Sequence, residues 1–317
     1  MSAFFSGPLV LTGASSFVGA HLASAFASAG ADVIGVHSRA LEDYDALRRA
    51  RLDHAARSAR LVRLDLRDHA AAIRLVESEK PAVWLHHVGY TENYTRPDFD
   101  WIGALDTTAR PLAALYPAFQ AAGTRVILTG TDQEYGAADT LNREDEACRP
   151  NTPYGLSKLA ESLAARQLAQ FHQVPTRIAR VYIPFGRFDN PGKLLPQVVQ
   201  ALGAGRPIAL SPGEQRRDFL GVADLCAAYL ALAADMDRTI VDIFNISSGE
   251  PMQLRRLLET ICGVMRADPN LLRFGELAMR PGEPPLSCGA SDKARELLGW
   301  SPRPLERAIQ EDLLSDP

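Results

Sequence analysis

A tyrosine and a lysine four residues apart, Tyr154 and Lys158, are the residues in this sequence best suited to acid–base chemistry. Residues four apart on a helix lie on one face, so the ammonium of Lys158 would stand near the tyrosine hydroxyl. A nearby positive charge favours the phenolate, and we expect it to lower the pKa of Tyr154 toward physiological pH. Such a tyrosine can exchange a proton with a hydroxyl or carbonyl oxygen of a substrate. We predict both residues to be catalytic. Without other motifs beside it, such a pair would more commonly be two solvent-exposed residues on a helix face.

A second set of candidates follows the predicted strand Arg125–Thr129 in the segment TGTDQEYG. The carboxyl ends of parallel strands point at the ligand crevice of an α/β sheet. Thr131 can therefore supply a hydroxyl to the same substrate oxygen as Tyr154, and we predict it to be catalytic. Asp132 and Gln133 come next and are predicted to contact the substrate.

A glycine- and serine-rich turn, GASSFVG, joins the predicted strand Pro8–Thr12 to an alanine-rich helix. Glycine permits a tight turn here and lets the helix N-terminus approach a pyrophosphate. Ser16 stands at the middle glycine position of such turns, where its hydroxyl could donate to a phosphate or its Cβ could crowd the backbone. A plain strand-to-helix turn is the alternative. The predicted cofactor residues of the turn are Gly13, Ser15, Ser16, Phe17, Val18 and Gly19.

The sequence His37-Ser38-Arg39 follows the predicted strand Asp32–Val36. An acidic residue there would bind the adenosine 2′-hydroxyl of NAD, whereas a guanidinium suits a 2′-phosphate. Ser38 and Arg39 therefore favour NADP(H), with NAD(H) as the other possibility; Arg39 as a solvated surface residue is the alternative. Asp65 and Leu66 follow the next strand, and Asp65 can accept a hydrogen bond from the adenine amino group.

Short apolar strands alternate with helical segments over the first half of the chain, which indicates a parallel sheet covered on both faces. Right-handed crossovers then give a doubly wound α/β Rossmann sheet. Beyond residue 183 proline and glycine become denser and the alternation ends. We predict a dinucleotide-binding domain over 1–182 plus about 219–248. A smaller, sequence-interleaved substrate cap is predicted over about 183–218 plus 249–317.

These motifs together resemble the extended short-chain dehydrogenase/reductases, the NAD-dependent epimerase/dehydratase family of nucleotide-sugar enzymes. The matching segments are Thr12–Gly19, Asp65-Leu66, Thr131 with Tyr135-Gly136, Pro153–Lys158, Arg180, Arg216–Phe219, Phe244–Ile246, Arg280–Glu283 and Leu297–Pro302.

The resemblance implies a role for each matching residue. Tyr154 would be the proton donor or acceptor, Lys158 would hold the nicotinamide ribose, and Thr131 would orient the reacting oxygen. Arg217 and Arg280 match the arginines that bind the nucleotide diphosphate.

Three features of the sequence depart from the family's pattern. The small residues expected beside the nicotinamide are His87, Val88 and Gly89 here, and Val88 is taken as the cofactor contact. Ile183 replaces a substrate-binding asparagine. The family's dehydratases carry an Asp-Glu pair after the threonine, but this chain has Asp132 followed by Gln133. A neutral amide cannot abstract a carbon-bound proton, so we expect no dehydration of a nucleotide hexose.

Three reactions share this scaffold: 4-epimerisation, 4,6-dehydration and keto reduction. A reductase consumes NADPH, so Arg39 favours the reduction at C4 of a nucleotide-linked 4-keto-6-deoxy sugar. A 4-epimerase with tightly bound NAD(P) is the alternative. A non-catalytic cofactor sensor or scaffold is a third, and the intact Thr131, Tyr154 and Lys158 speak against it.

Composition limits the partners of this 317-residue chain. Its formal net charge is −4 and it has no long basic run, so we expect no nucleic acid. No apolar stretch reaches the ~20 residues of a membrane helix, and the four cysteines have no metal-ligand spacing. We expect a cytoplasmic protein with reduced thiols and neither a metal site nor a membrane partner. The resemblance implies a homodimer formed through helices around Thr107–Ala122 and Tyr154–Phe171.

Overall fold

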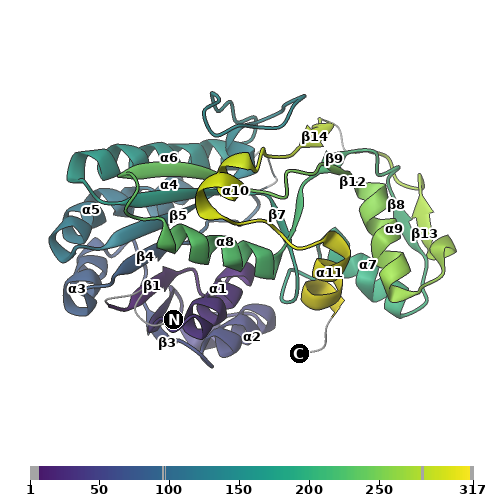
Figure 1. The fold of residues 1–317 in the computed structure, drawn as a ribbon. Coiled ribbons are helices and arrows are strands. Elements are labelled where there is room, and N and C mark those ends of the chain that lie inside the picture. The colour runs from purple at the N-terminus through teal and green to yellow at the C-terminus, as the bar shows by residue number, and fades with distance from the viewer. Residues whose placement is uncertain (1–6, 95, 97, 280–281, 315–317) are drawn as a thin grey trace.

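Seven parallel strands form the centre of the computed structural model, which describes residues 7–94, 96, 98–279 and 282–314 (Figure 1). In spatial order they are β11 (Val241–Ile246), β6 (Thr176–Val181), β5 (Arg125–Thr131), β4 (Val83–His86), β1 (Leu9–Thr12), β2 (Val33–His37) and β3 (Arg60–Arg63). The order reverses between β1 and β4, which leaves a crevice at their carboxyl ends. The predicted doubly wound sheet is confirmed.

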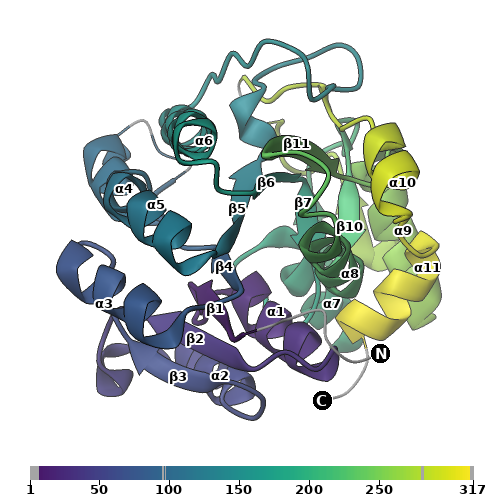
Figure 2. The same ribbon diagram turned by 60° about the vertical axis from the view of Figure 1, so that its left-hand side comes forward.

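Helices cover both faces of this sheet (Figure 2). One layer contains α1 (Phe17–Ser28), α2 (Ala46–Ala55) and α8 (Val222–Ala234). The other contains α3 (His69–Glu79), α4 (Trp101–Thr108), α5 (Arg110–Ala122) and α6 (Pro153–His172). Because both faces are covered, most central strands are apolar throughout, with every residue of β1 and β4 buried.

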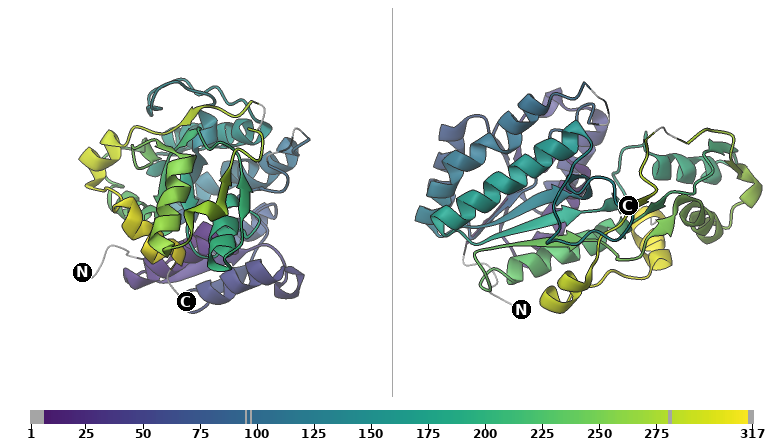
Figure 3. Two further views of the ribbon diagram at one scale, coloured as in Figure 1. Left: turned by 90° about the vertical axis from the view of Figure 1, so that its right-hand side faces the viewer. Right: turned by 90° about the horizontal axis from the view of Figure 1, so that it is seen from above.

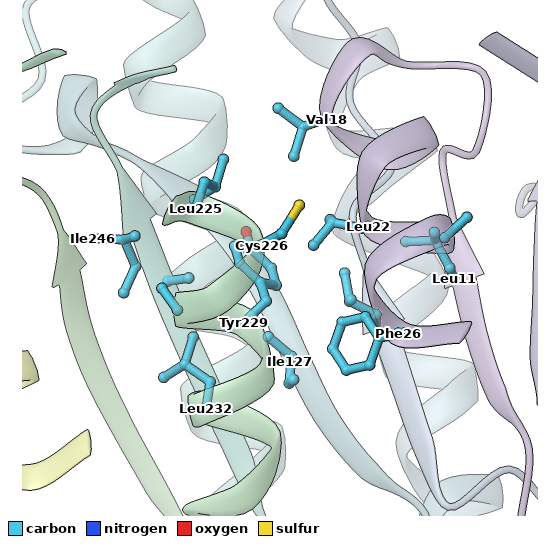
Figure 4. Packing of buried hydrophobic residues seen from close by; sticks show 14 of the residues in the cluster. Leu11, Val18, Leu22, Phe26, Ile127, Leu225, Cys226, Tyr229, Leu232 and Ile246 are labelled. Atoms are coloured by element: carbon cyan, nitrogen blue, oxygen red, sulfur yellow. The ribbon is translucent and has the colours of Figure 1, made fainter. Parts of the chain in front are cut away.

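The packing of α1 against α8 fixes the start of the first crossover (Figure 4). Leu22 and Phe26 of α1 face Leu225 and Tyr229 of α8, and all four side chains are fully buried. Truncating a buried leucine such as Leu22 to alanine costs about 2–5 kcal/mol. This contact therefore holds the turn between β1 and α1 at a fixed place above the sheet.

A smaller lobe lies beside the carboxyl end of the sheet (Figure 3). It contains α7 (Leu194–Gly203), β8 (Ile208–Leu210), α9 (Leu254–Met265), β13 (Leu272–Phe274) and α11 (Leu305–Ala308). Their apolar side chains form a core of their own, for example Val198, Leu257 and Ile261.

Short strands connect this lobe to the sheet. They are β7 (Ile183–Phe185), β9 (Arg216–Arg217), β10 (Phe219–Gly221), β12 (Met252–Gln253) and β14 (Leu286–Ser287). The C-terminal segment contributes to both cores, because Ala294 of α10 (Asp292–Leu298) and Trp300 pack on the large one. The division into two domains at the residues given above stays a prediction.

Two further findings concern the whole described part of the chain. No helix in it has both the length and the apolar character needed to cross a bilayer. The cysteines are free thiols, and Cys226, Cys262 and Cys288 are buried while Cys148 is half-buried.

Candidate active site

In the turn after β1, two glycines lie so close to neighbouring backbone carbonyls that no side chain would fit there. Gly13 has a φ of +75°, and a Cβ there would lie 2.7 Å from the carbonyl oxygen of His87. A Cβ at Gly19 would lie 2.2 Å from the carbonyl oxygen of Gly13. The turn therefore requires glycine at both positions, as predicted for a pyrophosphate cradle.

Ser16 is the N-cap of α1, and its Oγ accepts a hydrogen bond from the backbone N–H of Gly19 at 2.9 Å. Serine is a favoured N-cap residue, which explains it at a position where glycine is usual. The N–H groups of Phe17 and Val18 have no partner within the helix, because the first turn of a helix leaves its donors free. Together with the half-buried Ser15, they form a site suited to a phosphate.

The loop after β2 is held by Tyr44, whose hydroxyl accepts hydrogen bonds from the backbone N–H groups of Ser38 and Arg39. The His37 ring donates from Nδ1 to the carbonyl oxygen of Arg39 at 2.9 Å. Both contacts fix the course of the loop while the side chain of Arg39 stays exposed. The guanidinium is thus presented at the carboxyl end of β2, where the adenosine ribose of a bound dinucleotide lies.

Asp65 is engaged by Arg67 rather than free. Its two carboxylate oxygens accept from Nε and Nη2 of Arg67, the shorter distance being 2.5 Å, and this pairing lowers the pKa of Asp65. An adenine amino group would share the carboxylate with that guanidinium. Leu66 is buried next to it.

The end of β4 is tied to the end of β1 by Thr12. Its Oγ accepts from the backbone N–H groups of His87 and Val88, both at 2.9 Å. His87 contacts the hydroxyl of Thr129 through Nδ1 at 2.8 Å, and that hydroxyl contacts Tyr229 at 2.7 Å. Burial and the charge of Lys158 lower the pKa of His87 to about 3, so the imidazole is neutral.

Thr131 and Tyr154 are brought together by the contact between β5 and α6. Thr152 is the N-cap of α6, and its hydroxyl donates to Oε1 of Gln133 at 3.1 Å. A Cβ at Gly155 would lie 2.4 Å from the carbonyl oxygen of Gln133, so only glycine lets the helix approach this closely. The structure therefore places Thr131 at the last position of β5 beside the first turn of α6.

Lys158 is buried in an ion pair that sequence reasoning missed. Its Nζ lies 2.6 Å from Oε2 of Glu161, one turn further along α6, and both side chains are shielded from solvent. Burial raises the pKa of Glu161, while Lys158 and Thr108 lower it. The charge of Lys158 is thus not isolated, because a carboxylate lies directly beside it.

The expected lowering of the Tyr154 pKa is not what the structure shows. Burial raises this pKa, and the negative charge of Glu161 raises it further. The ring packs edge-on against Tyr94 and Phe99, with ring centroids 5.3 and 5.9 Å away. The error has two physical causes: the phenol is buried, which is the larger effect, and the carboxylate of Glu161 lies on the same helix.

Asp132 and Glu134 follow Thr131 in a 3₁₀ turn, Asp132–Glu134. Asp132 accepts hydrogen bonds from the hydroxyls of Ser287 at 2.7 Å and Thr131 at 3.1 Å, and burial raises its pKa. Glu134 is fully buried and pairs with Nε of Arg180 at 3.0 Å. The carboxylate of Glu134 is thus held in the interior by Arg180, Ser162 and the backbone of Thr131.

The arginine predicted to bind the diphosphate is paired in this structure. Arg217 on β9 donates from Nη2 to Glu283 at 2.8 Å, so a diphosphate would share or displace that carboxylate. Arg280, the second predicted arginine, lies outside the described residues. Ile183 begins β7 and is half-buried, and it offers no side-chain donor at the asparagine position.

The structure therefore has the predicted cofactor turn at the end of β1 and the predicted residues Thr131, Tyr154 and Lys158 at the end of β5 and the start of α6. A model of the NAD dependent epimerase/dehydratase family matches residues 9–247. The chain belongs to this family. Membership makes it an NAD-dependent enzyme, an epimerase or an oxidoreductase.

Individual relatives and structures agree with this assignment. The chain is 25% identical over 323 residues to a probable UDP-glucuronate 4-epimerase of Rhizobium meliloti, covering 92% of each chain. It is 32% identical over 131 residues to a dTDP-4-dehydro-6-deoxyglucose reductase of Escherichia coli, covering 40% of this chain and 41% of that one. The fold resembles that of a UDP-glucose-4-epimerase from Stenotrophomonas maltophila, which was solved with NAD and formylated UDP-arabinopyranose. The TM-score is 0.84, the sequence identity is 20%, and 96% of both chains is covered.

Proposed function

We propose that this chain is a nucleotide-sugar 4-epimerase that uses an NAD-type cofactor and Tyr154 as the proton acceptor and donor at O4 of the sugar. The observation that carries the proposal is the close approach of the start of α6, the helix of Tyr154 and Lys158, to the residues that follow Thr131 at the end of β5. The similarity to a probable UDP-glucuronate 4-epimerase over 92% of both chains supports the epimerase reaction over the reductase that the sequence favoured.

The reaction divides between the cofactor and this chain's residues. A bound nicotinamide would accept the hydride from C4 and later return it to the opposite face. For this reaction Tyr154 must first release its own proton. As the phenolate it takes the proton of the 4-hydroxyl as the C4–H bond breaks, leaving a ketone, and it returns that proton to O4 as the new C4–H bond forms.

Two further residues support this exchange. The Thr131 hydroxyl donates to Asp132 in this structure and would turn to donate to O4. Lys158 gives one of its three N–H donors to Glu161 and keeps the others for the ribose hydroxyls.

A second candidate, an NADPH-dependent 4-ketoreductase, is favoured by two observations. Arg39 is exposed at the carboxyl end of β2, where a 2′-phosphate of the cofactor would meet it. Tyr154 is held as the neutral phenol, which is the form that donates a proton to a ketone. The partial similarity to a dTDP-4-dehydro-6-deoxyglucose reductase agrees with this candidate.

Dehydration is the reaction that the site supports least. Removing water across C5 and C6 needs a base for the C5 proton, and Gln133 is a neutral amide. Glu134, the next carboxylate along the chain, is buried against Arg180. We therefore propose that no 4-keto-6-deoxy product forms from UDP-glucose, dTDP-glucose, CDP-glucose or GDP-mannose.

One assay with two arms tests the proposal. The purified chain is incubated with UDP-glucose or UDP-glucuronate and NAD, and the products are resolved by NMR. The 4-epimer should form without net reduction of NAD, and not with Tyr154→Phe. Stoichiometric NADPH oxidation with nucleotide 4-keto-6-deoxy sugars, and no epimer, would instead assign the reductase. Loss of water from any of the four nucleotide hexoses would assign a dehydratase.

We also propose a homodimer, formed by α4 and α6. Trp101, Ile102, Leu156, Leu163 and Phe171 are large apolar residues on these helices with exposed fractions between 44% and 79%. The sequence pointed to helices around 107–122 and 154–171. The second range corresponds to α6, whereas the first corresponds mainly to α5, and the exposed apolar residues nearest to it, Trp101 and Ile102, lie before it on α4. Sedimentation should show a dimer that Leu163→Lys dissociates, whereas a monomeric parent chain would contradict the proposal.

A further inference from the structure

Glu161 is the one carboxylate that contacts the catalytic lysine among the described residues. Its side chain is fully buried, and that of Lys158 is 6% exposed. A buried ion pair must be geometrically good to offset the loss of hydration, and the 2.6 Å distance meets that need. The pair is therefore an internal element of the site and not a contact on the surface.

The groups around this pair are mostly neutral on the β4 side. His86 Nε2 lies 3.6 Å from Oε1 of Glu161 and 2.9 Å from the carbonyl oxygen of Thr108. The indole N–H of Trp84 donates to Nδ1 of His86, so Nε2 carries the ring hydrogen. Burial and Lys158 lower the pKa of His86 to about 3, and the adjacent His87 behaves in the same way.

The remaining charged groups reach Tyr154 from other elements. The charges of Asp132 and Glu134 act on it from the turn after β5, and the ring of Tyr94, in the loop after β4, packs against it. Each of them disfavours the phenolate, and Arg180 balances Glu134 directly. Lys158 is thus the cation expected to stabilise the phenolate. How strongly it does so depends on how far the negative charge of Glu161 cancels its positive charge at Tyr154.

We propose that Glu161 is a positioning residue that offsets the field of Lys158 at Tyr154 and aims the ammonium toward the ribose site. Tyr154 then keeps its proton in the free enzyme. The proposal rests on the proposed acid–base role of Tyr154, although it does not depend on which sugar binds. It assigns to one buried carboxylate the control of a proton that either candidate reaction must transfer.

The experiment reads the ionisation of residue 154 directly, in the full chain without added ligand. Difluorotyrosine, whose phenol is more acidic than tyrosine, replaces Tyr154, and fluorine NMR follows its titration. Glu161→Gln keeps the shape and an oxygen acceptor for Lys158 but removes the charge. Glu161 and Tyr154 are seven residues apart on α6, which corresponds to about 10 Å along the helix. Removing one negative charge at that distance should lower the pKa of residue 154 by about one unit in Glu161→Gln. Glu296→Gln, an exposed change of the same kind on α10, should leave it in place.

A second variant keeps the test decisive if Glu161→Gln does not fold. Lys158→Met/Glu161→Gln removes both charges of the pair and leaves no buried ion without a partner. If the two charges offset each other at Tyr154, the double variant titrates within a few tenths of a pH unit of the parent. A rise of about one unit would mean that Lys158 alone tunes the tyrosine and would overturn the proposal. An unchanged titration in a folded Glu161→Gln variant would overturn it too.

The outcome is separate from that of the proposed function, because the NMR titration needs neither substrate nor turnover. If a nucleotide sugar is turned over, the limb of the pH profile of kcat/KM that reports Tyr154 should also move to lower pH in Glu161→Gln. If no sugar is turned over but the titration moves, the proposed reaction fails while the role of Glu161 stands.

Discussion

Replacing Glu134 with alanine should destabilise the fold without removing a catalytic base. Glu134 is fully buried, and its carboxylate accepts from Nε of Arg180, the hydroxyl of Ser162 and the backbone N–H of Thr131, each at 3.0 Å. Removing it leaves Arg180, which is 4% exposed, without its counter-charge. Breaking a buried pair in this way costs about 3–5 kcal/mol. At about 2 °C per kcal/mol for a chain of this size, Tm should fall by about 6–10 °C.

Two related variants separate the charge from the shape. Glu134→Gln keeps an oxygen acceptor for Thr131 and Ser162, so it should cost about 1.5–3 kcal/mol and leave kcat within about tenfold of the parent. Adding Arg180→Met to it removes both charges and should cost less than the sum of the single changes. The free energy of unfolding comes from urea titrations of each variant. A stable Glu134→Gln variant with kcat reduced about a thousandfold would refute this reasoning, because that loss is typical of a missing base.

Three more predictions concern the cofactor cradle, the cap and the adenosine end. Gly13→Ala should weaken binding of NAD or NADP more than tenfold in calorimetric titrations, because its Cβ meets the His87 carbonyl; Gly30→Ala, also at positive φ but in open space, should keep the affinity. Burial raises the pKa of Asp218 to about 6, above its unfolded value of about 3.9. The protonated Asp218 side chain therefore contributes fully to the free energy of unfolding below pH ~4, and this contribution is lost as pH rises through 6. This loss of about 2–3 kcal/mol should appear in urea titrations of the parent at pH 4 and 7 and be absent in Asp218→Asn. Arg39→Ala should weaken binding of NADP by about 1–3 kcal/mol more than binding of NAD in calorimetric titrations, and an equal effect on both cofactors would contradict this role of Arg39.

The sheet could be predicted from the sequence because its strands carry their own signal. Apolar runs such as Leu9–Thr12 and Val83–His86 are buried on both faces and need no partner to be recognised. The glycine turn could also be predicted, because the contacts that require its glycines are made by nearby backbone. Gly19 contacts the turn itself, and Gly13 contacts the residue that follows the neighbouring strand β4. Ser16 could have been assigned as an N-cap from its residue type and place before a helix.

The electrostatics of the site could not be predicted in the same way. Glu161 lies three residues after Lys158, a spacing that allowed an ion pair, but the sequence does not show that both side chains are buried against β4. The hydrogen bond from Ser287 to Asp132 joins residues 155 apart in sequence, and no local sequence pattern predicts it. Tyr44 fixes the loop at Ser38 through a hydroxyl that looks like an ordinary surface group in the sequence. Each of these depends on how the cap and loops fold over the sheet.

The most direct test of the account is the turnover of a nucleotide sugar by the parent chain and by Tyr154→Phe under the same conditions. With UDP-glucose or UDP-glucuronate and NAD, the account predicts a change of configuration at C4 and a kcat lower by about 10²–10⁴-fold in Tyr154→Phe. Cofactor affinity should change little, because Lys158 and the Gly13 turn remain. Near-normal turnover by Tyr154→Phe, or a product altered at a carbon other than C4, would contradict the assignment of Tyr154 as the acid–base residue for chemistry at C4.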